Sequence, residues 1–284
     1  MTNNQPMRFL SFGAGVQSTT LLRMILAGEI EPVDHVIFAD TGWEPRAVYE
    51  HLARMRTVCE DAGVPFHMVS NGNIRDDVLD PSKRFASMPL HVTGRDGKPP
   101  TMARRQCTEN YKLRPLQKKV RELVGLEPGQ RSKTLLAEMV IGISWDEVQR
   151  VKDPLYPWQR NSYPLVDRRI TRNDCLRWNA EQGFQLPPRS SCIGCPYHSD
   201  KEWRNVASNP VDWEDACQFD DAIRQVERFS VDKKLVLFEG RAFLHRSRIP
   251  LRDVDLRTEE EHGQEVLFGE DYGFGEECEG MCGV

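Results

Sequence analysis

The stretch Ser11-Phe12-Gly13-Ala14-Gly15-Val16-Gln17-Ser18 follows the apolar pair Phe9-Leu10 and precedes an apolar, helix-like segment over residues 19–27. A small-residue loop between a strand and a helix leaves the first backbone N–H groups of the helix without helical partners, at the positive end of the helix dipole. Gly13 and Gly15 let the backbone approach an anion closely, because neither carries a Cβ. The stretch predicts a phosphate-binding loop, with Ser18 as a hydroxyl donor and Ser11 assisting. An ordinary tight turn is the alternative.

A second strand pattern, residues 35–39, ends at Asp40-Thr41-Gly42. In a parallel sheet, ligands bind at the carboxyl ends of the strands, next to the point where the strand order reverses. We therefore expect residues 40–42 to lie beside the first loop and to border the same ligand.

The wider pattern of the chain alternates strands with helices. Strand-like runs at 8–12, 35–39, 65–70 and 138–143 and helix patterns at 19–27 and 46–62 predict an α/β fold. We expect a doubly wound, mostly parallel sheet with helices on both faces and a helical C-terminal extension. The expected regions are an α/β domain over 1–150, a helical, cysteine-bearing part over 151–252 and an acidic tail over 253–284.

Local signals add detail to this plan. Residues 71–106 are polar and rich in Pro and Gly, which is typical of a lid or binding loop. Capping boxes at 171–174 and 199–202 predict two helix starts, and Pro210 predicts a third, for a helix that runs towards Phe229.

The net charge of −5 is unevenly distributed along the chain. Residues 253–284 contain eleven acids and a single base, Arg257, so this segment carries −10 and the rest of the chain +5. A solvated acidic tail is the expectation, and a segment that shields a basic pocket is the alternative. Residues 103–123 hold seven bases, of which Arg104, Arg105 and Lys112 are placed to neutralise an anionic ligand.

The composition also indicates a compartment. No apolar run reaches the roughly 18 residues that a membrane span needs, and the first eight residues lack a signal-peptide core. We therefore expect a cytoplasmic protein with no membrane partner. In that reducing compartment eight cysteines indicate metal or redox use. Cys192 and Cys195 form a Cys-x-x-Cys turn, which supplies half of a metal site.

Together the two loops resemble those of the PP-loop ATP pyrophosphatases, or adenine nucleotide alpha-hydrolases, and within them the phosphoadenylyl-sulfate reductase group. That group reads Ser-Phe-Ser-Gly-Gly-x-Asp-Ser at the first loop, and Asp40-Thr41-Gly42 matches its second loop as it stands. Gly13 replaces a serine and Gln17 replaces an aspartate, and the lost charge bears on magnesium handling. The resemblance implies ATP or an adenosine phosphosulfate bound with Mg²⁺, the phosphates on residues 13–18 and the adenosine beside Asp40 and Gly42.

The resemblance also implies a role for Cys107. Iron–sulfur reductases of the group have a Cys-Cys pair followed by Lys and Pro, and Cys107, Lys112 and Pro115 keep that spacing, with Thr108 at the second Cys. Cys107, Cys192 and Cys195 would give a [4Fe–4S] cluster three thiolates, one fewer than full ligation. Related PP-loop sulfurtransferases that act on nucleobases look like this. A Zn²⁺ site completed by His198 and a reduced, metal-free turn are the alternatives.

Three functions are compatible with these motifs. The first is an ATP-dependent sulfurtransferase that adenylates a small-molecule or nucleobase acceptor, with cluster-bound sulfur displacing AMP. The second is an adenylyl or phosphoadenylyl sulfate reductase with Cys278 or Cys282 as nucleophile and a thioredoxin-like reductant, because 277–279 partly matches a Glu-Cys-Gly motif. The third is a non-catalytic nucleotide-sensing module. A tRNA or DNA partner and the oligomeric state stay open, since the positive patch is modest.

Overall fold

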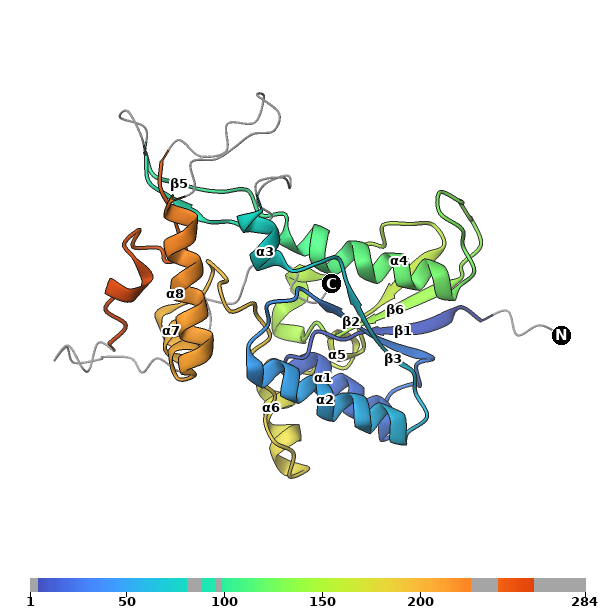
Figure 1. Ribbon diagram of the computed structural model, residues 1–284. Helices are drawn as coiled ribbons and strands as arrows, with labels where there is room; N and C mark the ends of the chain where they lie inside the picture. The colour runs from blue at the N-terminus through green and yellow to red at the C-terminus, as the bar shows by residue number, and fades with distance from the viewer. Residues whose placement is uncertain (1–4, 81–87, 95–98, 226–239, 258–284) are drawn as a thin grey trace. The chain divides into compact units, whose positions relative to one another are not determined.

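A computed structural model describes residues 5–80, 88–94, 99–225 and 240–257 (Figure 1). The chain forms two compact units. Among the described residues, the first comprises 5–71 and 109–190, and the second comprises 72–80, 88–94, 99–108, 191–225 and 240–257. The chain therefore passes between the units after residues 71, 108 and 190.

The first unit is built on a five-stranded parallel sheet. Its strands are β1 (Met7–Ser11), β2 (His35–Asp40), β3 (Phe66–Ser70), β6 (Ala137–Ile141) and β7 (Gln159–Ser162), in the order β3-β2-β1-β6-β7. The chain adds β2 and β3 on one side of β1 and then β6 and β7 on the other. The strand order therefore reverses between β1 and β6, which confirms the predicted doubly wound α/β fold.

Helices cover both faces of this sheet, as Figure 1 shows. Successive strand residues point to opposite faces, and apolar residues on each face pack against helices. Leu10, Val36 and Val140 pack in one core with α1 (Val16–Leu26), α2 (Arg46–Asp61) and α6 (Arg172–Glu181). Phe9 and Met139 pack in the opposite core with α4 (Arg114–Leu123). A short helix, α5 (Pro164–Asp167), precedes α6, and a 3₁₀ segment, η2 (Trp145–Arg150), follows β6.

The second unit holds a small antiparallel sheet of β4 (His91–Val92), β5 (Thr101–Met102) and β8 (Ala242–Phe243), in the order β5-β4-β8. It also contains α3 (Ile74–Leu79), α7 (Asp200–Ala207), α8 (Pro210–Gln225) and the 3₁₀ turn η3 (Leu251–Asp253). The segment 71–106, expected to be a lid or binding loop, thus contains α3, β4 and β5. The helical extension is present as α7 and α8, and both predicted capping boxes are formed, at Thr171 and Ser199.

In the described part of the chain no helix is long and apolar enough to cross a membrane. Most of the acidic tail, including Cys278 and Cys282, lies outside the described residues.

Candidate functional site

The loop after β1 makes a sharp turn into α1. Gly15 is the N-cap of the helix in an extended conformation, and Ala14 before it is left-handed, with φ +59° and no exposed surface. Left-handed backbone at a residue other than glycine is strained, and such strain concentrates at functional sites. The Ser18 hydroxyl closes the turn, since it accepts from the Gly13 N–H and donates to the Gly15 carbonyl oxygen, both at 3.2 Å. By helix geometry, the N–H groups of residues 16–18 have no partner inside α1 and lie at its positive end.

The end of β6 meets this loop backbone to backbone. A Cβ on Gly142 would lie 2.9 Å from Ser18 Cα, which is closer than real Cβ atoms come, and 3.0 Å from Ser18 N, which is also a tight contact. A glycine is therefore required where the strand order reverses. Gly142 was not among the residues predicted for the site. The available signal was a glycine directly after a buried strand.

An arginine from α6 reaches the same loop. Arg172 Nη1 donates to the Gln17 side-chain oxygen at 3.1 Å, and Gln17 is only 8 % exposed. Arg172 is the first residue of α6, and its backbone N–H donates to Asp146 in η2 at 3.0 Å. A second contact, from Asn179 to the Thr20 hydroxyl at 2.6 Å, fixes α6 along α1. Arg172 was not predicted either, because nothing local ties it to a loop 155 residues away.

The end of β2 is held by an acid at its last residue. Asp40 Oδ1 accepts from the Gly42 N–H at 2.8 Å and from the Tyr49 hydroxyl at 3.0 Å. Gly42 needs to be glycine, because its φ of +74° is left-handed. Burial, with the nearby Asp40 and Glu44 adding to it, raises the pKa of Tyr49 well above its ordinary value. The phenol therefore stays a donor to Asp40 at neutral pH.

The next residues of the β2 loop connect it to the helix on the opposite core. Thr41 donates to the buried Glu44 at 2.9 Å, and Lys112 Nζ lies 3.9 Å from the same carboxylate oxygen. Lys112 belongs to a π-helical segment, η1 (Thr108–Leu113), that runs into α4. π-Helical turns are frequent at functional sites. Lys112, which was predicted to neutralise an anionic ligand, therefore lies close to the loop that follows β2.

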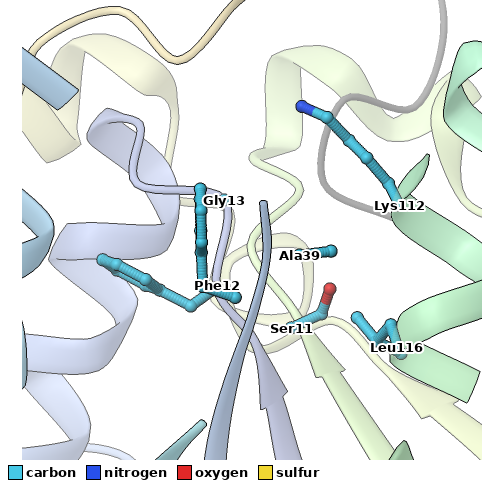
Figure 2. A pocket seen from close by; sticks show the side chains of 7 residues that line it. Ser11, Phe12, Gly13, Ala39, Lys112 and Leu116 are labelled. Atoms are coloured by element: carbon cyan, nitrogen blue, oxygen red, sulfur yellow. The ribbon is translucent and has the colours of Figure 1, made fainter. Parts of the chain in front are cut away.

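A pocket opens between the ends of β1 and β2 and the segment that leads into α4. Figure 2 shows Lys112 and Leu116 on one side of it and Phe12 and Gly13 on the other. The lining residues are Ser11, Phe12, Gly13, Phe38, Ala39, Lys112 and Leu116. The first unit thus brings together the predicted loop residues 11–18, Asp40–Gly42 and Lys112. Arg104 and Arg105 belong to the second unit, so their part in nucleotide binding stays a prediction.

The three predicted metal ligands lie in the second unit. Cys192 and Cys195 form a turn in which the Cys195 N–H donates to the Cys192 carbonyl oxygen at 3.1 Å. His91 on β4 bonds the next carbonyl, that of Pro196, at 3.0 Å through Nε2, and must therefore carry the proton there. Burial lowers the pKa of His91, which keeps the ring neutral. The turn is thus tied to the small sheet.

Arg105, two residues before Cys107, makes a cation–π contact with Tyr197, two residues after Cys195. The Arg105 guanidinium lies 5.3 Å from the Tyr197 ring centre, and Arg105 also donates to Thr108 at 2.9 Å. Cys107, Cys192 and Cys195 are partly exposed thiols outside any disulfide. Within the described residues, however, no three His, Cys, Asp or Glu side chains form a group that could hold a metal ion. The three thiols therefore do not form a ready ligand set.

His198 and three further cysteines are buried among core residues. His198, the predicted fourth zinc ligand, is buried, with Nε2 3.0 Å from Ser191 Oγ and its ring edge-on to Trp203. Cys59, Cys175 and Cys217 are buried, and burial raises the pKa of these thiols to about 11, 12 and 11. They are core residues.

Similarity to known proteins is found at the level of structure. No model of a protein family matches the chain. No curated protein matches it either. Among solved structures, it is similar to the U34-tRNA thiolase NcsA from Methanococcus maripaludis, determined with its [4Fe-4S] cluster. The TM-score is 0.41 and the identity 13 %, over 83 % of this chain and 77 % of that chain. A similarity of this size assigns neither a family nor a substrate.

Proposed function

We propose that this protein is a PP-loop enzyme that cleaves ATP at the α-phosphate and uses the adenylated acceptor for sulfur transfer. One observation carries the proposal: a strained, glycine-containing loop lies at the carboxyl end of β1, where the strand order reverses. Open α/β sheets bind their ligands at this point. The loop presents the positive end of α1, which suits phosphate.

In this proposal, each part of the nucleotide is assigned to residues around the loop. Backbone N–H groups of residues 16–18 would hold phosphate oxygens, and Lys112 would neutralise the charge. Asp40 and Gly42 would border the adenosine. In the reaction, a carbonyl oxygen of the acceptor attacks the α-phosphorus and pyrophosphate leaves. A sulfur nucleophile then attacks the activated carbon, and AMP leaves with the oxygen.

The sulfur chemistry of this proposal rests on the cysteine spacing in the second unit. Cys192 and Cys195 share a turn, and Arg105, two residues before Cys107, contacts Tyr197 of the same segment. A cluster held by these thiols would supply an iron that is open to sulfur. Because the described geometry contains no ready metal group, iron content is the deciding measurement.

The test compares products from ATP and from adenosine phosphosulfate. The proposed sulfurtransferase releases pyrophosphate and AMP from ATP in the presence of its acceptor, whereas a reductase would release sulfite from the phosphosulfate. A sensor would bind nucleotide and turn over neither. Binding of neither nucleotide would contradict the proposal at its first step.

The iron measurement follows from anaerobic purification. We expect about four iron and four sulfide per chain, the complement of one [4Fe–4S] cluster, and loss of both in Cys192→Ala. Cys217→Ala is the matched control, because that buried thiol lies in the core of the same unit. About one zinc per chain would favour the zinc alternative, and unchanged iron in Cys192→Ala would contradict the ligand assignment.

A further inference from the structure

The charges around the loop suit a bound polyanion and not a bound metal cation. Residues 11–18 contain no acid, and Gln17, in the first turn of α1, is a neutral amide. The groups that reach the loop from elsewhere in the unit are cationic: Arg172 donates to Gln17, and Lys112 lines the adjoining pocket. A divalent cation placed here would meet positive charge and the positive end of α1.

Each carboxylate near the strand ends has one oxygen that accepts from a protein donor. Asp40 accepts from Gly42 and Tyr49, Glu44 from Thr41 with Lys112 beside it, and Asp146 from the N–H of Arg172. Mg²⁺ is usually held by one or two carboxylates together with substrate phosphates. Residues 11–18 offer no carboxylate for this purpose. The magnesium implied by the family resemblance therefore does not fit the residues at this loop.

A buried hydroxyl beside the loop is suited to an anion. The Ser190 Cβ lies 3.8 Å from where a Cβ on Gly15 would be, and the buried Ser190 Oγ has no hydrogen-bond partner among the described residues. A buried hydroxyl without a partner is costly unless a ligand supplies one. A phosphate oxygen is an acceptor of the kind that this hydroxyl lacks.

We propose that the loop binds the polyphosphate of a nucleotide without a divalent cation, and that Arg172, oriented by Gln17, supplies the charge in its place. This inference rests on the proposed nucleotide site. The Gln17 side-chain oxygen only accepts, so it holds one guanidinium nitrogen and orients the planar fork at the loop. A guanidinium matches two phosphate oxygens at once, which a lysine ammonium does not do. Arg172 is thus a binding residue for phosphate, and Gln17 is a positioning residue.

The test is equilibrium binding of ATP to the full chain, measured by calorimetry with excess EDTA and again with excess Mg²⁺. The dissociation constant of the wild type should be no larger in EDTA than in Mg²⁺. Arg172→Ala should weaken binding in EDTA by about tenfold or more, which is about 1.4 kcal/mol. The ATP affinity of Arg172→Lys in EDTA should lie between those of the wild type and Arg172→Ala. Gln17→Asp should bind weakly in EDTA, because the new carboxylate pairs with Arg172. Binding should recover with Mg²⁺, because a carboxylate can hold that cation together with the phosphates.

Arg177→Ala is the matched control. Arg177 lies on the same helix but is exposed and pairs with Asp174 and Glu181, so ATP affinity should not change. Thermal melting of each variant checks that it folds. Wild-type binding that is lost in EDTA, or an Arg172→Ala variant that binds as the wild type does, would overturn the inference and leave the proposed nucleotide site in place. Absence of ATP binding in both buffers would instead overturn the proposed function itself.

Discussion

The backbone contact between Gly142 and Ser18 leads to a prediction at the scale of single residues. In Gly142→Ala the new methyl group would meet backbone atoms of Ser18 that cannot rotate away. We expect a loss of stability of about 1–3 kcal/mol, as for an overpacked core, and weaker nucleotide binding because the loop is displaced. Urea unfolding and calorimetry measure the two effects.

Gly15→Ala is the control for this substitution. Its Cβ would have Ser190 Cβ at 3.8 Å as its nearest neighbour, which is an ordinary van der Waals contact, and φ is −92°. Its stability should therefore stay at the wild-type value. If Gly142→Ala is as stable as Gly15→Ala, the loop and β6 do not pack as described.

His51 gives a prediction on pH. It is buried on α2 with Nε2 2.9 Å from the Thr19 hydroxyl, and burial lowers its pKa to about 4 from 6.5. Below pH 6.5 His51 binds a proton in the unfolded chain but stays neutral in the folded chain. The free energy of unfolding therefore falls as the pH drops toward 4. For this residue alone the loss between pH 7 and pH 5 should be about 2 kcal/mol.

His51→Gln should remove that part of the pH dependence and leave the contributions of the other histidines. The free energy of unfolding in urea at pH 7, 6 and 5, for the wild type and the variant, measures the difference. Parallel curves for the two proteins would mean that His51 is not held neutral by burial.

Residues of the site were predictable from the sequence where the signal is local. The loop over 11–18 and Asp40–Gly42 follow from small residues and strand ends, and the structure places both at one edge of the sheet. Arg172 and Gly142 were not predictable in their roles, because each acts through a contact with a segment far away in the sequence. The cluster ligands and the roles of Cys278 and Cys282 stay predictions.

At the scale of elements, β1, β6 and β7 are joined by a ladder of charged side chains. Glu138 on β6 is 5 % exposed in its side chain and accepts from Arg8 on β1 at 3.1 Å and from Arg160 on β7 at 2.7 Å. Glu138→Ala removes the acid that Arg160 pairs with and leaves Arg8 with its ion pair to the exposed Glu31. Because Arg160 is half exposed, we expect a loss of about 2 kcal/mol, below the 3–5 kcal/mol of a fully buried pair.

The control for the ladder is an exposed pair of similar geometry. Lys119 Nζ lies 2.7 Å from Glu122 on α4, but Glu122 is 63 % exposed. Exposed pairs contribute little, so Glu122→Ala should leave the urea midpoint unchanged. Equal effects in the two variants would mean that burial does not set the strength of the ladder.

Elements with apolar runs or capping residues were predictable, whereas others lacked such signals. The strand patterns at 8–12, 35–39, 65–70 and 138–143 correspond to β1, β2, β3 and β6. Strand β7 reads Gln-Arg-Asn-Ser and has no apolar alternation, since it lies at the sheet edge. Strands β4, β5 and β8 have two residues each, and their pairing joins distant segments, which no local pattern encodes.

At the scale of the whole molecule, the division into units does not follow the order of the chain. Residues 72–108 belong with residues beyond 190, because β4 pairs with β8 at His91–Phe243 and Val92–Ala242. The polar, Pro-rich composition after residue 70 indicated a lid or binding loop within a domain over 1–150. It did not indicate the partner, since strand pairing is set by the fold and not by the composition of one segment.

This division predicts that the first unit folds alone. It contains all five strands of the parallel sheet and both cores that cover it. The ends left by removing 72–108 are close together, because the Asn71 side chain donates to the Asn110 carbonyl oxygen at 2.9 Å.

A chain of residues 1–71 joined through a short Gly-Ser linker to 109–190 should therefore unfold cooperatively. It should bind ATP, since the loop, Asp40, Lys112 and Arg172 are all retained, and it should carry no iron, since Cys107, Cys192 and Cys195 are removed. Circular dichroism melting, calorimetry and metal analysis test the three expectations. A non-cooperative melt would show that the sheet depends on the second unit, and bound iron would show that the cluster ligands lie elsewhere.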